Sequence, residues 1–449
     1  IGMSAVAGIC LEQGITASGS AIEQNQLTTK LQKKGMVFFL GHKKENVGSP
    51  DLVVMSAAVP LDNPEIVESK EKGVPVCLYS EFLGELMGAK MGVGVAGTHG
   101  KTTTTAIIAT VLQYSGVEPT VVCGGVMKNF GSNSLYGRGQ YFIAEACEYR
   151  RSFLNLKKKA AVVTNIEPDH LECYGDIEQI KKAFADFINT TSRQGFVVVN
   201  GDDPNIQSII KKLPSEINII TVGEATCNQY RIADVKAQRG YYSLGITSSN
   251  KQVLDLTLPV PGRYNCTNAA LASIFALNIG INSTVIANSV KTFKGTERRM
   301  EYLGRAGGDL IYSDYAHHPT EIKHTLDALR EEYPQRHILV VFQPHQHSRT
   351  VFFLNGFADT LVQADSLVLV DIYLQRDSQE YTSRINGYQV FKKLRTKAPQ
   401  KNIVYIKRKE AVIKFLKKDN FPGERVVVFM GAGSIDNVAR EYAKASSPG

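Results

Sequence analysis

The chain has 449 residues, which is too long for one hydrophobic core, so we expect two or three domains. Hydrophobic residues make up 43% and charged residues 21%, as in an ordinary globular protein, and we find no run of about 18 apolar residues that could cross a bilayer. The net charge of +8 comes from scattered lysine doublets without interleaved aromatic residues. This pattern argues against nucleic-acid and membrane partners and suits small ligands that carry phosphate.

The apolar first residues, 1–11, have no basic leader and no small-residue cleavage site, so we interpret them as the start of a folded domain. Because the chain starts at Ile1, we expect that an upstream piece with a first strand is missing. The seven cysteines are dispersed, odd in number and without a C-x-x-C pair. They are typical of a reducing compartment and argue against a disulfide framework or a zinc site.

Short β-branched runs alternate with helical segments, which predicts an α/β fold with mostly parallel sheets. The predicted strands are residues 51–56, 92–96, 141–146, 160–165, 196–200, 217–222, 337–342, 366–371, 402–406 and 425–430. Between residues 240 and 260, apolar residues alternate without a helix, so we predict a small antiparallel insertion there. We divide the chain into three domains, residues 1–89, 90–301 and 302–449.

The strongest motif lies between a predicted strand and a predicted helix. It reads Gly97-Thr98-His99-Gly100-Lys101-Thr102-Thr103. Glycines let backbone N–H groups surround a phosphate, and the following helix N-terminus favours an anion. Lys101 would reach the β- and γ-phosphates, and the Thr102 hydroxyl a Mg²⁺ ion. Because Val95 stands where the standard P-loop has its first glycine, the motif is a shortened variant; the alternative is a chance glycine turn before an ordinary helix.

Polar residues follow the next two predicted strands. Glu145 lies at the end of strand 141–146, where it could hold a metal ion beside the phosphate loop, and we interpret Glu148 as a surface carboxylate. Asp169 and His170 follow strand 160–165, at the edge where ligands of open α/β sheets bind. His170 is therefore either a ligand of a metal or acyl phosphate, or a structural histidine.

Two further pairs could contact a nucleotide. Asn265 and Asn268 lie one helical turn apart, so both amides could contact a base, although N-capping by Asn265 explains part of this pattern. Arg298 and Arg299 lie at the second domain boundary. They could clamp phosphates or remain solvated.

In the third domain, two loops follow predicted strands and so fall on one sheet edge. The first, residues 313–321, contains His318, and the second, residues 342–349, ends at Arg349, which suits a carboxylate or phosphate. His345 and His347 have a spacing seen at metal sites, but we do not favour a metal there. The run 431–433 resembles a dinucleotide fingerprint without its third glycine, which favours close strand–helix packing.

Together these motifs resemble those of the Mur ligase family over nearly the whole chain. The resemblance rests on residues 97–105, Glu145, Asp169-His170, Asn265 with Asn268, and residues 314–321. It implies a Rossmann-like N-terminal domain that binds a UDP-sugar, a central P-loop-type domain that binds ATP, and a Rossmann-like C-terminal domain that binds an amino acid. It also implies that ATP activates the carboxylate of UDP-N-acetylmuramate as an acyl phosphate, which L-alanine then attacks.

The resemblance also implies roles for individual residues. The catalytic residues would be Lys101, Glu145, His170, His318 and Arg349. ATP would contact Gly97, Thr98, His99, Gly100, Lys101, Thr102, Thr103, Asn265, Asn268, Arg299 and Asp314. One Mg²⁺ would bind Thr102 and Glu145, and a second His170. The UDP-sugar would contact Gly2, Met3, Ser4, Ser18 and Ser56.

At three positions the chain differs from what some or all family members carry. Ala21 replaces an aspartate, and Gln346 stands where some relatives carry arginine. Phe184 stands where sister ligases carry a carboxylated lysine, so we predict a metal site without a lysine carbamate; in the alternative, Lys181 or Lys182 takes that role.

The rival interpretations are a sister ligase that adds a peptide or another amino acid, folylpolyglutamate synthase, a P-loop nucleic-acid ATPase, and a nucleotide-binding regulator without turnover. From the resemblance we expect a monomer or weak dimer in the bacterial cytoplasm, with a role in peptidoglycan synthesis.

Overall fold

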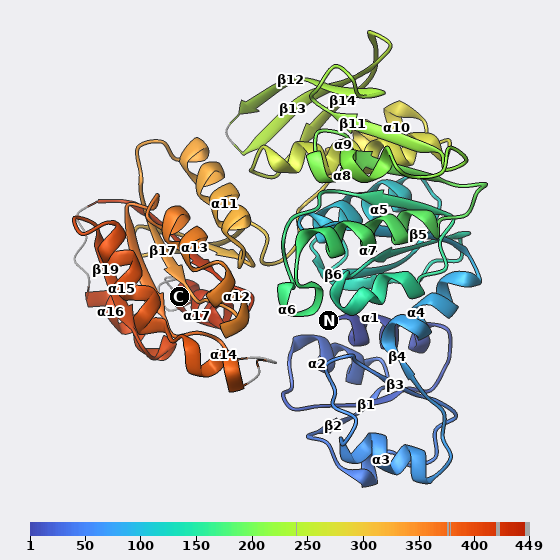
Figure 1. Cartoon of the computed structure of the whole chain (residues 1–449), viewed down its shortest axis with the longest axis horizontal. Helices are drawn as coiled ribbons and strands as arrows, with labels where there is room; N and C mark the ends of the chain where they lie inside the picture. Colours follow the sequence, from blue (N-terminus) through green and yellow to red (C-terminus); the bar gives the residue numbers. More distant parts are fainter. Residues whose placement is uncertain (239, 375–376, 378, 419–422, 445–449) are drawn as a thin grey trace.

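The computed structural model describes residues 1–238, 240–374, 377, 379–418 and 423–444. Within these residues the chain forms three α/β lobes, with the N-terminal lobe in blue, the central lobe from cyan to yellow and the C-terminal lobe in orange and red (Figure 1). The predicted three-domain α/β class is confirmed, and every predicted strand overlaps a strand of the structure. Residues 445–449 of the predicted third domain lie outside the described residues, and the exact domain boundaries stay predictions.

The N-terminal domain alternates short strands with helices. Its elements are α1 (Gly2–Glu12), β1 (Ser18–Ala21), α2 (Gln26–Lys33), β2 (Val37–Leu40), β3 (Val53–Met55), α3 (Pro64–Glu71), β4 (Val76–Leu78) and α4 (Tyr79–Gly88). β1 pairs in parallel with β2, and β3 pairs in parallel with β4. The described residues therefore form two separate two-stranded sheets, with the parallel pairing expected of a Rossmann-like domain.

The central domain is built on one ten-stranded sheet, in the order β14-β13-β12-β11-β10-β9-β5-β8-β6-β7. Its strands are β5 (Met91–Ala96), β6 (Thr120–Met127), β7 (Ser132–Leu135), β8 (Tyr141–Glu145), β9 (Ala160–Val163), β10 (Phe196–Asn200), β11 (Ile219–Gly223), β12 (Tyr230–Gln238), β13 (Tyr241–Ser248) and β14 (Lys251–Leu258). Its helices are α5 (Lys101–Tyr114), α6 (Leu171–Tyr174), α7 (Ile177–Asn189), α8 (Pro204–Ile210), α9 (Tyr264–Asn278) and α10 (Ser283–Val290). The predicted antiparallel insertion is confirmed, because β13 pairs antiparallel with both β12 and β14.

Helix α7 illustrates how local sequence determines the packing. Asp176 caps its N-terminus by accepting a hydrogen bond from Gln179 N. Phe184 and Phe187 lie on one helix face and pack against Phe153. Phe184, which stands where sister ligases are expected to carry a lysine, is therefore part of an aromatic cluster in the core.

The C-terminal domain has a six-stranded sheet in the order β15-β16-β20-β17-β18-β19, in which only β15 is antiparallel to its neighbour. Its strands are β15 (Glu301–Ala306), β16 (Asp309–Asp314), β17 (His337–Phe342), β18 (Ser366–Val370), β19 (Asn402–Ile406) and β20 (Arg425–Met430). Its helices are α11 (Pro319–Glu332), α12 (His347–Phe352), α13 (Leu354–Leu361), α14 (Gln379–Arg384), α15 (Gly387–Lys397), α16 (Val412–Lys418) and α17 (Ile435–Lys444). Hydrophobic clusters fill both faces of this sheet.

The segment before β15 connects the central and C-terminal domains and is hydrogen-bonded to both. Thr296 pairs with Met127, and Glu297 N donates to Val126 O over 2.9 Å, so residues up to Glu297 belong to the central domain. The Arg298 guanidinium donates to the carbonyls of Gly431 and Gly433, over 2.7 and 3.0 Å. Arg298 therefore belongs to the C-terminal domain, and its contact with a phosphate stays a prediction.

None of the helices within the described residues combines the length and apolar character needed to cross a membrane.

Candidate active site

The predicted phosphate loop connects β5 to α5 and contains two glycines in left-handed conformations. Gly97 has φ 140° and Gly100 has φ 83°. A Cβ atom at Gly97 would collide with the Thr164 hydroxyl, and one at Gly100 would collide with the side-chain amide of Asn268. Both positions therefore require glycine, and Asn268 lies directly against the loop.

The residues after β9 hold the phosphate loop in shape. His99 N donates to Asn165 Oδ1 over 2.8 Å, and Asn165 Nδ2 donates back to His99 O over 3.0 Å. Thr98 N donates to Asn165 O over 2.9 Å. The sequence interpretation gave Asn165 no role. Its position directly after the strand beside β5 was the available signal.

Lys101 is folded onto its own loop and pairs with a buried carboxylate. Its Nζ donates to the carbonyls of Gly97 and Thr98 and lies 2.9 Å from Glu148 Oε2. The interpretation of Glu148 as a surface residue is wrong, because only 4% of it is exposed. After β8 the chain turns inward, and the Tyr174 hydroxyl donates to the Glu148 carbonyl. Burial alone would lower the pKa of Lys101, but the Glu148 carboxylate raises it.

Thr102 and Glu145 form an oxygen-donor pair at the start of α5. Thr102 Oγ1 donates to Glu145 Oε1 over 3.1 Å, and Gly124 N donates to Glu145 Oε2 over 2.6 Å. A hydroxyl and a carboxylate are the donor types that Mg²⁺ prefers, so this pair fits the predicted magnesium ligands. Thr103 is buried in the next position of α5.

His170 stands at the N-terminus of α6 in a left-handed conformation, with φ 51°. Its Nδ1 lies 3.4 Å from Glu172 Oε1, and its ring packs edge-on against Tyr149. Burial would lower its pKa, but the neighbouring Asp169 raises it. Both His170 and Lys101 interact electrostatically with Glu148, so the three side chains belong to one region.

Arg349 reaches from the C-terminal domain to the central domain. Its Nε donates to Asp169 Oδ1 over 3.1 Å and its Nη2 to Oδ2 over 3.3 Å, while Nη1 donates to Gln346 Oε1 over 3.0 Å. Although burial raises the pKa of Asp169, Arg349 holds it well below its ordinary value. Gln346 therefore orients the arginine that pairs across the domain boundary.

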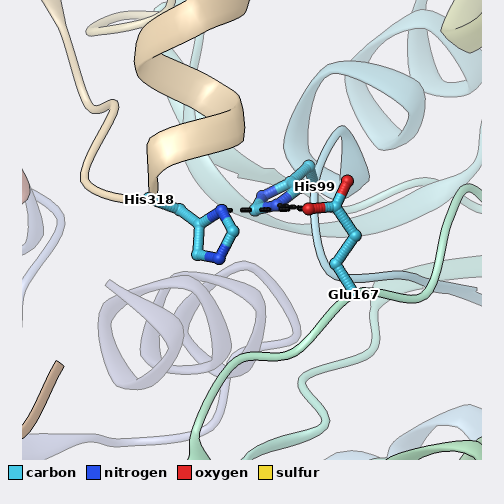
Figure 2. A group of neighbouring side chains, drawn as sticks. All are labelled: His99, Glu167 and His318. Atoms are coloured by element: carbon cyan, nitrogen blue, oxygen red, sulfur yellow. Dashed lines mark ion pairs between the residues drawn. The ribbon is translucent and has the colours of Figure 1, made fainter. Parts of the chain in front are cut away.

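His318 and His99 face each other across the same boundary (Figure 2). Their ring centroids lie 4.8 Å apart, and Glu167 lies close to both, with its Oε2 3.6 Å from His99 Nε2 and 3.9 Å from His318 Nδ1. Burial would lower the pKa of His99, but Glu321 and Glu167 raise it to about 9. Burial and the charge of His99 lower the pKa of His318 to about 4. From the sequence, neither Glu167 nor Glu321 was assigned a role.

The residues after the phosphate loop that are predicted to contact the nucleotide gather near the start of α9. Asn268 Nδ2 donates to Asn265 Oδ1 over 3.1 Å, and Tyr264 stacks on His324 of the C-terminal domain. Arg299 lies 3.4 Å from Glu321. Both carboxylate oxygens of Asp314 accept backbone N–H groups, from Met300 and Ala316, and burial raises its pKa to about 6. The Asp314 carboxylate thus holds together the backbone segments on either side of it, near Met300 and Ala316.

The two histidines with metal-site spacing, His345 and His347, do not act as a pair in this structure. His345 stacks on Tyr373, whereas His347 lies 3.2 Å from Asp377, so these histidines contact different partners.

In the N-terminal domain, Gly2, Met3 and Ser4 lie in the first turn of α1, and Ser4 accepts a hydrogen bond from Asn133 of the central domain. Ser18 begins β1, whereas Ser56 follows the carboxyl end of β3. Near the carboxyl end of β1, a different serine is part of a polar cluster: Ser20 Oγ donates to Glu65 Oε2 over 2.6 Å and lies 3.0 Å from His42 Nδ1.

Three family models match consecutive parts of the chain. The model described as "Mur ligase family, catalytic domain" matches residues 1–91, "Mur ligase middle domain" matches residues 95–276, and "Mur ligase, glutamate ligase domain" matches residues 298–433. The UDP-N-acetylmuramate–L-alanine ligase of Aquifex aeolicus is 39% identical over 99% of this chain and 95% of its own length. The chain belongs to the Mur ligase family.

Other relatives agree. The UDP-N-acetylmuramate–L-alanine ligase of Acetivibrio thermocellus is 38% identical to this Mur ligase over 99% of the chain and 94% of its own length. The crystal structure of UDP-N-acetylmuramate-alanine ligase from Thermotoga maritima superposes with a TM-score of 0.84 at 28% identity, covering 99% of this chain and 96% of that one. A murein peptide ligase from Psychrobacter arcticus shares the fold, with a TM-score of 0.74 at 21% identity and the same coverages.

Proposed function

We propose that this Mur ligase joins L-alanine to the carboxylate of UDP-N-acetylmuramate in an ATP-dependent step of peptidoglycan precursor synthesis. The observation that carries the proposal is the boundary between the central and C-terminal domains. There the phosphate loop with His99 and Lys101 faces the start of α11 with His318. The names of the relatives at 38% and 39% identity support the same reaction.

In the proposed reaction, an oxygen of the sugar carboxylate attacks the γ-phosphorus of ATP, the bond to the β–γ bridging oxygen breaks, and ADP leaves. The amine of L-alanine then attacks the acyl carbon and loses a proton, and inorganic phosphate leaves with the bonding electron pair. Such a transferring phosphoryl group needs positive charge around its oxygens and little covalent help. The chain must therefore supply cations, positioning and protection from water.

Lys101 would supply the fixed cation of the phosphate loop. In the structure its charge is matched by the buried Glu148, so binding of ATP would replace one anionic partner by another. A Mg²⁺ ion held by Thr102 and Glu145, and a second near His170, would add positive charge at the same phosphoryl group. The Asn268 side chain would contact the adenine, with Asn265, Arg299 and Asp314 around it.

The C-terminal domain would provide the amino-acid side of the site through His318 and Arg349. Because these residues are on a different domain from the phosphate loop, the docked arrangement assembles the site. Docking also keeps water away from an acyl phosphate that would otherwise hydrolyse. The uridine end of the substrate would bind the N-terminal domain, at Gly2, Met3, Ser4, Ser18 and Ser56.

The test is release of phosphate from ATP with UDP-N-acetylmuramate and a panel of amino acids. We expect release that needs the sugar nucleotide and is fastest with L-alanine. Preference for a tripeptide would instead indicate a peptide-adding ligase, and release that responds to nucleic acid but not to the sugar would refute the ligase assignment. We further propose a monomer or weak dimer in the bacterial cytoplasm, which size-exclusion chromatography and cell fractionation would test.

A further inference from the structure

Three side chains from two domains converge on one point at the boundary described above (Figure 2). They are His99 and Glu167 of the central domain and His318 of the C-terminal domain, and one ligand atom from each lies within 4.8 Å of the others. His99 is 9% and His318 is 4% exposed. Among the described residues, this is the group of histidine, cysteine and acidic side chains that converges closely enough to hold a metal ion.

Contacts outside the cluster fix which ring nitrogen faces inward. His99 Nδ1 lies 3.2 Å from Glu321 Oε1, so an N–H donated there leaves the Nε2 lone pair facing Glu167. His99 Nε2 is buried and has no hydrogen-bond partner in the part of the chain that the structure describes.

His318 is oriented in the same way. Its Nε2 lies 3.1 Å from the carbonyl oxygen of Pro168. A carbonyl can only accept, so Nε2 carries the proton and Nδ1 keeps a lone pair. This lone pair accepts a long 3.3 Å hydrogen bond from Thr320 N, a helix-capping contact that a bound ion would replace. A carboxylate or carbonyl that holds the outer N–H of a histidine is the usual arrangement behind a metal-bound imidazole.

The cluster is slightly wider than an occupied site. Nitrogen and oxygen ligands lie about 2.0–2.2 Å from Zn²⁺, which places them roughly 3.3–3.5 Å apart in a tetrahedron. The distances from Glu167 Oε2 to His99 Nε2 and His318 Nδ1 are 3.6 and 3.9 Å. A small inward movement of the side chains would therefore form three metal bonds and leave a fourth position for water.

We propose that His99 Nε2, Glu167 Oε2 and His318 Nδ1 bind a divalent transition-metal ion of the zinc class at the domain boundary. Two imidazoles with one carboxylate favour Zn²⁺ or Co²⁺ over Mg²⁺, which prefers oxygen ligands. The site shares no ligand with the Thr102–Glu145 pair. Because its ligands come from both domains, the ion would hold the C-terminal domain in its docked position.

The experiment titrates the chelator-treated full-length chain with Co²⁺ in excess Mg²⁺ and follows the visible absorption of four-coordinate Co²⁺. We expect one Co²⁺ per chain, which Zn²⁺ displaces. Glu167→Gln and His318→Ala should each lower Co²⁺ affinity by at least about 100-fold, and Glu321→Gln, which loosens the outer hold on His99, by about 10–100-fold. Glu167→Gln keeps the shape of the side chain, so a loss of binding there is not a loss of folding.

Two variants serve as matched controls. His324→Ala removes a histidine of α11 that stacks on Tyr264, and His170→Ala removes the histidine proposed for Mg²⁺. Both should keep the parent Co²⁺ affinity. Unchanged affinity in Glu167→Gln and His318→Ala, or loss of the signal in His170→Ala, would overturn the proposal. So would a parent chain without the Co²⁺ spectrum, which would identify the cluster as an ion pair in which a proton on His99 takes the place of the metal.

Discussion

The two outer domains are attached to the central domain in opposite ways. On the N-terminal side, Ile9 of α1 and Met87 of α4 belong to the same hydrophobic core as Phe142 and Phe153 of the central domain. On the C-terminal side, the hydrophobic clusters formed by the described residues separate between Phe293 and Met300. This boundary is instead formed by polar contacts, such as Arg349 with Asp169 and Thr320 with Glu167.

The difference indicates which domain can move. Separating two apolar surfaces costs free energy in proportion to the area that becomes exposed to water, whereas charged groups that separate regain their hydration. We therefore expect the N-terminal and central domains to behave as one unit, and the C-terminal domain to open and close over the phosphate loop.

The largest effect should come from removing the cation at the polar boundary. Lys101→Met should lower turnover at least about 1,000-fold, roughly 4 kcal/mol of barrier, because the phosphoryl group loses its fixed positive charge. Phosphate release measures the loss.

The same substitution leaves the buried Glu148 without its partner and so threatens stability. The double variant Lys101→Met with Glu148→Gln separates the two effects. If this variant is folded and works at nearly the parent rate, the role of Lys101 is wrong.

Asp169→Asn tests the polar boundary itself. It removes the charge partner of the buried Arg349, and we expect the docked arrangement to weaken by about 3 kcal/mol. Small-angle scattering should show a larger radius of gyration. Asp327→Asn, at an exposed pair with Lys323, is the matched control and should leave scattering unchanged. If Asp169→Asn instead unfolds the chain without first separating the C-terminal domain, the expectation that this domain moves as a unit is wrong.

Ile9→Ala tests the apolar boundary. This side chain is 1% exposed, and its truncation should lower the free energy of unfolding by about 2–3 kcal/mol without changing the scattering profile. A denaturant titration measures the loss. Ile15→Ala, at a site that is 49% exposed, should change stability by about 0.5 kcal/mol or less. A larger radius of gyration in Ile9→Ala would show that the apolar boundary also opens, which would contradict the difference between the two boundaries.

Lys158 is a basic group inside the apolar unit, where its Nζ contacts Thr190 and the Phe187 ring. Burial lowers its pKa from 10.5 to about 7. Between these pH values the unfolded chain binds a proton that the folded chain does not, so stability should rise as pH rises from 7 to 10.5. Lys158→Met should remove this rise and should increase the free energy of unfolding at pH 7. Lys159 is exposed, so the control variant Lys159→Met should change neither the pH dependence nor the stability at pH 7.

The smallest effects are expected at Lys181 and Lys182. Lys181 pairs with Glu178, Lys182 is exposed, and Phe184 is fully buried in the apolar core. Alanine at either lysine should leave phosphate release within about tenfold of the parent, less than about 1.4 kcal/mol. A collapse of activity that acetate or formate restores would instead show a lysine carbamate.

The strands and the phosphate loop could be predicted from the sequence because the patterns that indicate them lie within a few consecutive residues. Runs such as 337–342 are continuous and apolar, as in strands buried on both faces. β6 went unpredicted because Gly124 and Gly125 interrupt its apolar run. The phosphate loop was predicted because its glycines and Lys101 lie within a few residues.

The partners of the site residues could not be predicted in the same way. Asp169 and Arg349 are 180 residues apart, and Lys101 and Glu148 are 47 apart. Only the fold brings them together. Glu148 was misinterpreted because a carboxylate in a loop is usually solvated, and nothing local indicates that this loop turns inward to a lysine.

The segment between α10 and β15 connects the central and C-terminal domains. Glu297 is hydrogen-bonded to β6, whereas Arg298, one residue later, is fastened to the loop after β20 through its guanidinium. If the C-terminal domain opens as proposed, we expect the backbone torsions near these two residues to absorb the rotation. The opening angle then depends on a hinge about one peptide long, and Arg298, with φ 59°, already adopts a conformation that is unusual outside glycine.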